Sequence, residues 1–263
     1  MSPLLARTEI IRRLLETESE YRVKVLLAVE SGSRAWGFES PDSDFDARFI
    51  YVHERDWYLS IDEKRDVIEY PIVDDIDLNG WDLRKALRLF LNSKPAIVEW
   101  IQSPIVYREH GPFAAACRSL ISEVYSCERG IYHYRSMAKT NYRGYLREKL
   151  VPLKKYFYVL RPLLSVLWLE AYSKPAPIEF GKLLHLIDGQ TMLVADICEL
   201  LERKRQAPEM GLAPQIASIH EFIEKELMRL DSIDYKAVYS PNRSVTVLNE
   251  LFIRCLPDGH FQH

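Results

Sequence analysis

The sequence lacks most of the features that would define its class at once. Its four cysteines show no CxxC or other metal-ligand spacing and are too few for a disulfide-stapled secreted module, so we expect a reducing, cytoplasmic location. The N-terminal residues 1–13 do not have the pattern of a cleaved signal peptide. The most apolar stretch, 156–172, carries Arg161 and Glu170 and falls short of the ~20 apolar residues of a membrane span. HxH, HExxH and GxSxG motifs are also missing, which leaves little support for a zinc enzyme or a serine hydrolase.

A large net charge is absent as well. The chain of 263 residues has 35 Lys and Arg against 38 Asp and Glu, which gives −3 and excludes a polycation that coats nucleic acid along its whole length. The total conceals two blocks of opposite sign. Residues 39–82 hold 14 acidic and 4 basic side chains, whereas residues 129–161 hold 9 basic and 1 acidic side chains with 6 tyrosines among them. This asymmetry predicts that electrostatic function lies in these two blocks.

The hydrophobic pattern predicts an α+β fold. The first third alternates buried-strand patterns with helical spacing; strands are expected at 23–29, 45–52, 66–70 and 73–78, and helices at 4–18 and 83–91. Asn79-Gly80 is expected to form a turn, and Asp82 to cap the helix that follows. The chain from residue 112 to residue 255 has helical patterning almost throughout. We therefore expect two domains, a mixed α/β domain at 1–108 and a helical domain at 109–263.

The most informative stretch is ESGSRAWGFESPDSDFDARFIY, residues 30–51. Asp44 and Asp46 open the second predicted strand, and side chains two residues apart on a strand point to the same face. Two converging carboxylates repel each other unless a cation lies between them. Hard oxygen ligands that face the same way suit Mg²⁺ or Mn²⁺, so this pair is a candidate metal site.

A candidate phosphate site precedes these acids. Gly32 would allow the backbone to approach a phosphate closely, Ser33 adds a hydroxyl, and the N–H groups that follow can hold an anion. A second acidic pair, Asp75 and Asp77, lies in a later strand candidate that would bring a third carboxylate to the same metals. A phosphate cradle, three carboxylates and two cations are the parts of a two-metal phosphoryl or nucleotidyl transfer site.

The order Gly-Ser, Asp-x-Asp and a later lone Asp resembles the DNA polymerase beta nucleotidyltransferase superfamily. More closely, GSRAWGFESPDSDFDARFIYV, DWYLSI and DIDLNGWDLRKALRL resemble bacterial YcgL-like predicted nucleotidyltransferases, the RNA repair pathway DNA polymerase beta family (RlaP). The resemblance implies a small mixed sheet with helices on one side and a helical domain that closes over the nucleotide. It also implies Mg²⁺-dependent transfer of a nucleoside monophosphate from an NTP, with release of pyrophosphate.

The resemblance also implies roles for single residues. Gly32 and Ser33 would hold the triphosphate, and Asp44 and Asp46 would bind both metal ions. Asp77 is the expected third acid, which would bind the metal that activates the attacking hydroxyl, and Asp75 is the alternative.

Several neighbouring side chains allow two interpretations. Arg34 and Trp36 either line the site or, in the case of Trp36, pack in the core, and Arg48 either neutralises the acids or contacts the nucleotide. In the basic block, Lys139, Lys155 and Arg161 are the preferred phosphate contacts; an ordinary solvated helix face is the alternative.

The sequence thus predicts a nucleotidyltransferase with two Mg²⁺ or Mn²⁺ ions. The expected acceptor is an RNA end, in RNA repair or tRNA metabolism and alongside RNA-repair partner enzymes, since the family name and the basic block both favour it. The alternatives are transfer to a small-molecule or protein hydroxyl, and a nucleotide-binding regulatory module without turnover.

Overall fold

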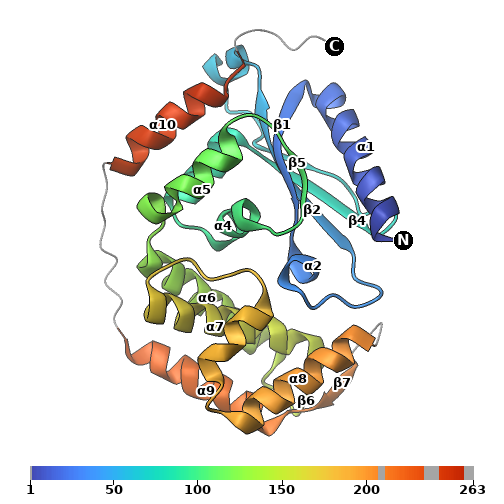
Figure 1. Cartoon of the computed structure of the whole chain (residues 1–263), viewed down its shortest axis with the longest axis vertical. Helices are drawn as coiled ribbons and strands as arrows, with labels where there is room; N and C mark the ends of the chain where they lie inside the picture. Colours follow the sequence, from blue (N-terminus) through green and yellow to red (C-terminus); the bar gives the residue numbers. More distant parts are fainter. Residues whose placement is uncertain (1, 207–210, 234–242, 258–263) are drawn as a thin grey trace. The chain divides into compact units, whose positions relative to one another are not determined.

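Residues 2–206, 211–233 and 243–257 are described by the structure, which is a computed structural model (Figure 1). They belong to two units. The first comprises the described residues of Met1–Ala35, Asp44–Tyr125 and Ser240–His263, and the second those of Trp36–Ser43 and Ser126–Tyr239. A mixed sheet with helices forms the first unit and helices dominate the second, which confirms the predicted α+β class.

The sheet of the first unit has five strands in the order β3-β4-β2-β1-β5. Their bounds are β1 Val23–Glu30, β2 Phe45–His53, β3 Val67–Glu69, β4 Ile76–Asp82 and β5 Val106–Glu109. β2 and β4 pair in parallel, and the other neighbours are antiparallel. The strands expected at 23–29, 45–52 and 66–70 are confirmed, whereas β5 was not predicted.

The prediction of a turn at Asn79-Gly80 is wrong. Both residues lie inside β4, where they pair with Arg48 and Phe49 of β2. Gly80 is required there for a different reason, because a Cβ at this position would overlap the ring of Phe49. The turn instead lies before β4, at Asp74 and Asp75, which both have positive φ angles of 55° and 61°.

Helices cover both faces of the sheet, so the expectation of helices on one side is wrong. On one face α1 (Pro3–Tyr21) places the helically spaced Ala6, Ile10 and Leu14 against the core side chains of β1, β2 and β4. The other face is covered by α3 (Leu83–Leu91), α4 (Pro95–Gln102), α5 (Phe113–Val124) and α10 (Arg243–Cys255). Burial of these two apolar layers fixes the strands that carry the acidic residues.

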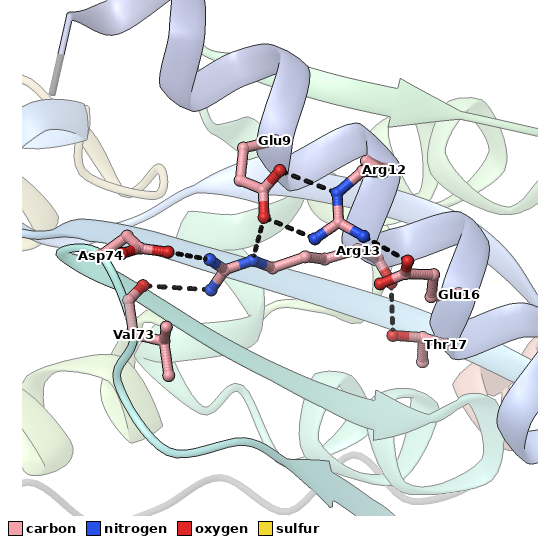
Figure 2. A network of polar contacts seen from close by, with 7 residues as sticks. All are labelled: Glu9, Arg12, Arg13, Glu16, Thr17, Val73 and Asp74. Carbon is pink, nitrogen blue, oxygen red and sulfur yellow. Dashed lines mark hydrogen bonds and ion pairs between the residues drawn. The ribbon is translucent and has the colours of Figure 1, made fainter.

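The turn before β4 is attached to α1 (Figure 2). Arg13 donates hydrogen bonds to the backbone carbonyl of Val73 at 3.0 Å and to Asp74 Oδ2 at 2.8 Å, and Glu9 holds the same guanidinium at 2.7 Å. Phe45 N, at the start of β2, donates to the carbonyl of Asp75 at 2.7 Å. These contacts fix the position from which β4 begins, directly before Asp77.

The second unit is built from helices and one small two-stranded sheet. Its elements are α6 (Cys127–Tyr145), β6 (Leu150–Pro152), η2 (Leu153–Tyr156), α7 (Phe157–Tyr172), η3 (Phe180–Ile187), α8 (Thr191–Gln206), β7 (Leu212–Pro214) and α9 (Ala217–Ser232). The segment Trp36–Ser43 also belongs here, since the buried Phe38 packs on Phe157 and Phe180 at ring-centroid distances of 4.9 and 5.6 Å. Residues Trp36–Ser43 are thus anchored among the helices of this unit.

The units divide the chain differently from the expected ranges 1–108 and 109–263. α5 and α10 pack on the sheet of the first unit, so its boundary falls after Tyr125 and the chain returns to it near its end. Within the described ranges, no helix combines the length and apolarity needed to cross a membrane.

Candidate active site

Directly after β1, the backbone passes close to the carboxylate of Asp46. Gly32 follows this strand with φ +60°, and a Cβ at this position would overlap the carboxylate of Asp46. Both the backbone conformation and the close approach therefore require glycine. Ser33 comes next, half-buried in the first turn of the short helix α2 (Gly32–Trp36).

Asp46 and Asp77 lie side by side on β2 and β4. They are partners in the parallel register, so their side chains project from the same face of the sheet. Arg48 joins them, with its Nη2 at 3.0 Å from Asp46 Oδ1 and 2.6 Å from Asp77 Oδ2. Asn79 also donates its side-chain amide to Asp77 Oδ1. Neutralisation by Arg48 therefore applies to Asp46 and Asp77, whereas its contact with a nucleotide stays a prediction.

Asp44 is exposed and lies in the loop directly before β2. Its carbonyl accepts a hydrogen bond from Arg34 Nε at 3.2 Å, and the Arg34 guanidinium lies 3.9 Å from the ring centroid of Phe45. Arg34 is therefore held beside the start of β2.

Burial makes the charged form of Asp46 less stable. Burial raises the pKa of Asp46 above its usual range, Arg48 opposes this shift, and the nearby carboxylates of Asp77 and Asp44 increase it. A cation at this position stabilises the charged form. In this structure the guanidinium of Arg48 supplies the positive charge.

Glu30, the last residue of β1, is a part of the site that sequence reasoning missed. It is 1% exposed, and its Oε1 accepts a hydrogen bond from the backbone N–H of Asp46 at 2.7 Å, while Tyr107 donates to Oε2. Burial raises the pKa of Glu30 to about 7. An acidic residue at the end of the apolar run VKVLLAVE, directly before Gly-Ser, was the available signal.

The position of Asp75 differs from that of Asp77. Asp75 lies before β4 in a left-handed conformation, so the rule that strand residues two apart share a face does not apply to this pair. Asp82, at the other end of β4, accepts a hydrogen bond from Arg84 N at 2.8 Å and is confirmed as the cap of α3.

The donor atoms around Asp46 do not form a complete metal site as they stand. Across the described parts of the chain, no three Asp, Glu, His or Cys side chains are arranged closely enough to hold a metal ion as they stand. Asp46 and Asp77 nevertheless already share one cationic partner, the guanidinium of Arg48. Carboxylate oxygens are the ligands that Mg²⁺ and Mn²⁺ prefer.

The predicted phosphate contacts of the basic block belong to the second unit and have different surroundings. Lys139 forms an ion pair with Asp231 at 2.6 Å. Arg161 is 3% exposed and lies 4.5 Å from the ring centroid of Trp36. Lys155 lies between two tyrosine rings, Tyr145 and Tyr158, at 4.2 and 4.8 Å from their centroids.

The comparisons with known proteins establish the family of this chain. The RNA repair pathway DNA polymerase beta family (RlaP) matches residues 6–254, and the chain belongs to this family. It is 47% identical over 224 residues to the uncharacterized protein YcgL of Bacillus subtilis (strain 168), which covers 85% of this chain and 86% of that protein.

A solved structure is also similar. It is a nucleotidyltransferase-like protein from Exiguobacterium sibiricum 255-15, with 12% sequence identity and a TM-score of 0.34 over 83% of this chain and 75% of that chain.

Proposed function

We propose that this protein transfers a nucleoside monophosphate from an NTP to the hydroxyl of an RNA end and releases pyrophosphate. The observation that carries the proposal is the pairing of Asp46 and Asp77 in register, against a Gly32 that has no room for a side chain. Membership of a family named for RNA repair supports the choice of RNA as acceptor.

In the proposed reaction the acceptor hydroxyl attacks the α-phosphorus of the NTP. A new oxygen–phosphorus bond forms, the bond to the β-phosphate oxygen breaks, and pyrophosphate leaves. Asp77 would receive the proton of the attacking hydroxyl, while Gly32, Ser33 and Arg34 would hold the triphosphate. The chain contributes chiefly by holding the reacting groups in place and by matching their charge.

Asp44, Asp46 and Asp77 would hold two Mg²⁺ or Mn²⁺ ions. When bound, these ions would neutralise the phosphate charge and lower the pKa of the attacking hydroxyl. Arg48 would then be the counter-ion of the resting state, because it contacts two of the same carboxylates. This same contact favours one competing function, a nucleotide-binding module in which Arg48 permanently takes the place of the metal.

One feature bears on the cellular context. All four cysteines are free thiols, which favours a reducing compartment such as the cytoplasm. An enzyme that adds nucleotides to an RNA end would act between partner enzymes that cleave RNA and enzymes that seal it.

The test is transfer of label from each α-labelled NTP to total cellular RNA in the presence of Mg²⁺ or Mn²⁺. We expect labelled RNA with the unchanged chain and at least about a 100-fold loss with Asp46→Asn. The control is Asp56→Asn, an exposed aspartate of the 3₁₀ segment η1 (Arg55–Leu59), which should keep full activity. Pyrophosphate release without labelled RNA would move the acceptor to a protein or a small molecule. Nucleotide binding without pyrophosphate release would favour the regulatory module.

A further inference from the structure

Some surface cations of the second unit, such as Arg135, Lys139, Lys182 and Arg229, each contact a carboxylate at 2.6–2.8 Å. The segment 143–155 differs because it concentrates cations that do not. Inside this segment there are five cations against the single acid Glu148; the five are Arg143, Arg147, Lys149, Lys154 and Lys155. In the described parts of the chain, none of these five contacts a carboxylate.

The five cations lie on continuous, described structure. The segment runs from the last turn of α6 through β6 and into η2, and all of its cations are exposed except Lys155, which is half-buried. The negative end of the α6 dipole stabilises Arg143 locally, but that effect fades within one turn and does not reach Lys149 or Lys154. Among the described residues, folding of the unit therefore leaves these concentrated positive charges without a carboxylate partner.

Two aromatic rings complete this surface. Tyr145 and Tyr158 are 43% and 40% exposed, and Lys155 Nζ lies between them. The ring faces stabilise the ammonium in place of a carboxylate. Tyr158 also contacts Trp36 edge to face at 6.1 Å, which limits its motion. Exposed rings held in position next to these cations are available to a ligand.

We propose that the five cations together with Tyr145 and Tyr158 form a binding surface for single-stranded RNA. Backbone phosphates would contact the cations, and unpaired bases would stack on the tyrosines, which a base-paired duplex cannot offer. That the strand is the acceptor of nucleotidyl transfer rests on the proposed function. Binding itself rests only on this surface.

The test is fluorescence anisotropy with a labelled single-stranded RNA of about 15 nucleotides, in EDTA and without NTP, so that no chemistry is required. The same RNA in a duplex is measured in parallel. We expect the single strand to bind more tightly than the duplex, with an affinity that falls steeply as KCl rises from about 50 to about 200 mM.

Variants locate the binding. The double variant Arg143→Ala, Arg147→Ala should raise Kd about 10-fold and reduce the salt slope by about 1.4, for two lost phosphate contacts. Tyr145→Ala should raise Kd at least about 5-fold, whereas Tyr145→Phe, which keeps the ring, should bind like the unchanged chain. Lys182→Ala removes a paired, exposed cation of the same unit and should have no effect.

Three results would each refute the proposed binding surface: no binding of the single strand at low salt, a Kd of the double arginine variant equal to that of the unchanged chain, or tighter binding of the duplex. These outcomes are separate from the label-transfer assay. RNA binding at this surface without label transfer would leave the surface standing and the proposed function refuted. Label transfer by the unchanged chain, together with unaltered RNA binding by the variants, would support the proposed function and refute this binding surface.

Discussion

The acidic region around Asp46 and Asp77 and the basic region at residues 143–155 differ in how their charges are compensated. In the first unit the half-buried guanidinium of Arg48 is shared by Asp46 and Asp77, and Asn79 satisfies a further oxygen of Asp77. In the second unit, the described cations of residues 143–155 have no carboxylate partner and remain near solvent. Charges removed from water must be paired, whereas exposed charges can stay available. The acidic region is therefore sensitive to the loss of any member, and the basic region tolerates substitution.

The largest effect is expected at Gly32. Gly32→Ala combines a left-handed backbone with overlap of the Asp46 carboxylate, so we expect a loss of about 3 kcal/mol in unfolding free energy. Gly111→Ala is the matched control, since Gly111 has φ +68° but open space around it; it should cost only about 1 kcal/mol. Urea denaturation measures both variants. Equal losses would show that the carboxylate does not lie against Gly32.

Breaking the shared ion pair should have the next largest effect. Arg48→Met leaves two half-buried carboxylates uncompensated, and we expect a loss of about 2 kcal/mol, less than for a fully buried pair because the side chains are partly exposed. Millimolar Mg²⁺ or Mn²⁺ should restore part of the loss, because a ligand that binds only the folded state stabilises it. Arg65→Met, which breaks an exposed pair with Glu69, should cost less than about 0.5 kcal/mol and show no metal response.

His53 is a second basic side chain on the same strand as Arg48, but the charge that acts on it is the cation Lys64 and not a carboxylate. Its ring stacks on Trp57 at 3.9 Å, and burial together with Lys64 lowers the pKa of His53 from 6.5 to about 4. The unfolded chain thus binds this proton more readily. The stability contribution is complete above pH 6.5 and is lost progressively as the pH falls toward 4. Denaturation across this range should be steeper in pH for the unchanged chain than for His53→Gln; identical slopes would refute the assignment.

The smallest effect is expected in the basic region. Arg143→Ala, Arg147→Ala removes no ion pair among the described residues and relieves like-charge repulsion, so stability should change by less than about 0.5 kcal/mol. Thermal denaturation at low salt is the measurement. A loss above about 1 kcal/mol would mean that these arginines have internal partners, and the contrast between the two regions would disappear.

The sequence predicts those features that depend on short-range pattern. Strand alternation placed Asp46 near the start of β2, although Asp44 lies in the loop before the strand, and the capping role of Asp82 followed from its position before a helical repeat. The turn prediction at Gly80 failed because glycine is required there to leave room for the ring of Phe49 on the neighbouring strand, and not to form a turn. Such a requirement is visible only once the strands are paired.

Other features depend on contacts between distant parts of the chain. The short strand β5 forms because β1 provides an open edge, and the segment Trp36–Ser43 joins the helical unit because Phe38 packs on Phe157. Glu30 gained its role only when β1 and β2 brought it beside the backbone of Asp46. A single sequence contains these residues but does not state their partners.

The central claim is that Asp77, beside Asp46 on the paired strand, acts in nucleotidyl transfer. The most direct measurement is the rate of pyrophosphate release from NTP with Mg²⁺ and RNA for the unchanged chain, Asp77→Asn and Asp75→Asn. Asparagine tolerates the left-handed conformation of residue 75, so that control should fold normally. We predict at least about a 100-fold lower rate for Asp77→Asn and little change for Asp75→Asn. Equal rates in all three chains, or no release by the unchanged chain with any NTP, would contradict the account.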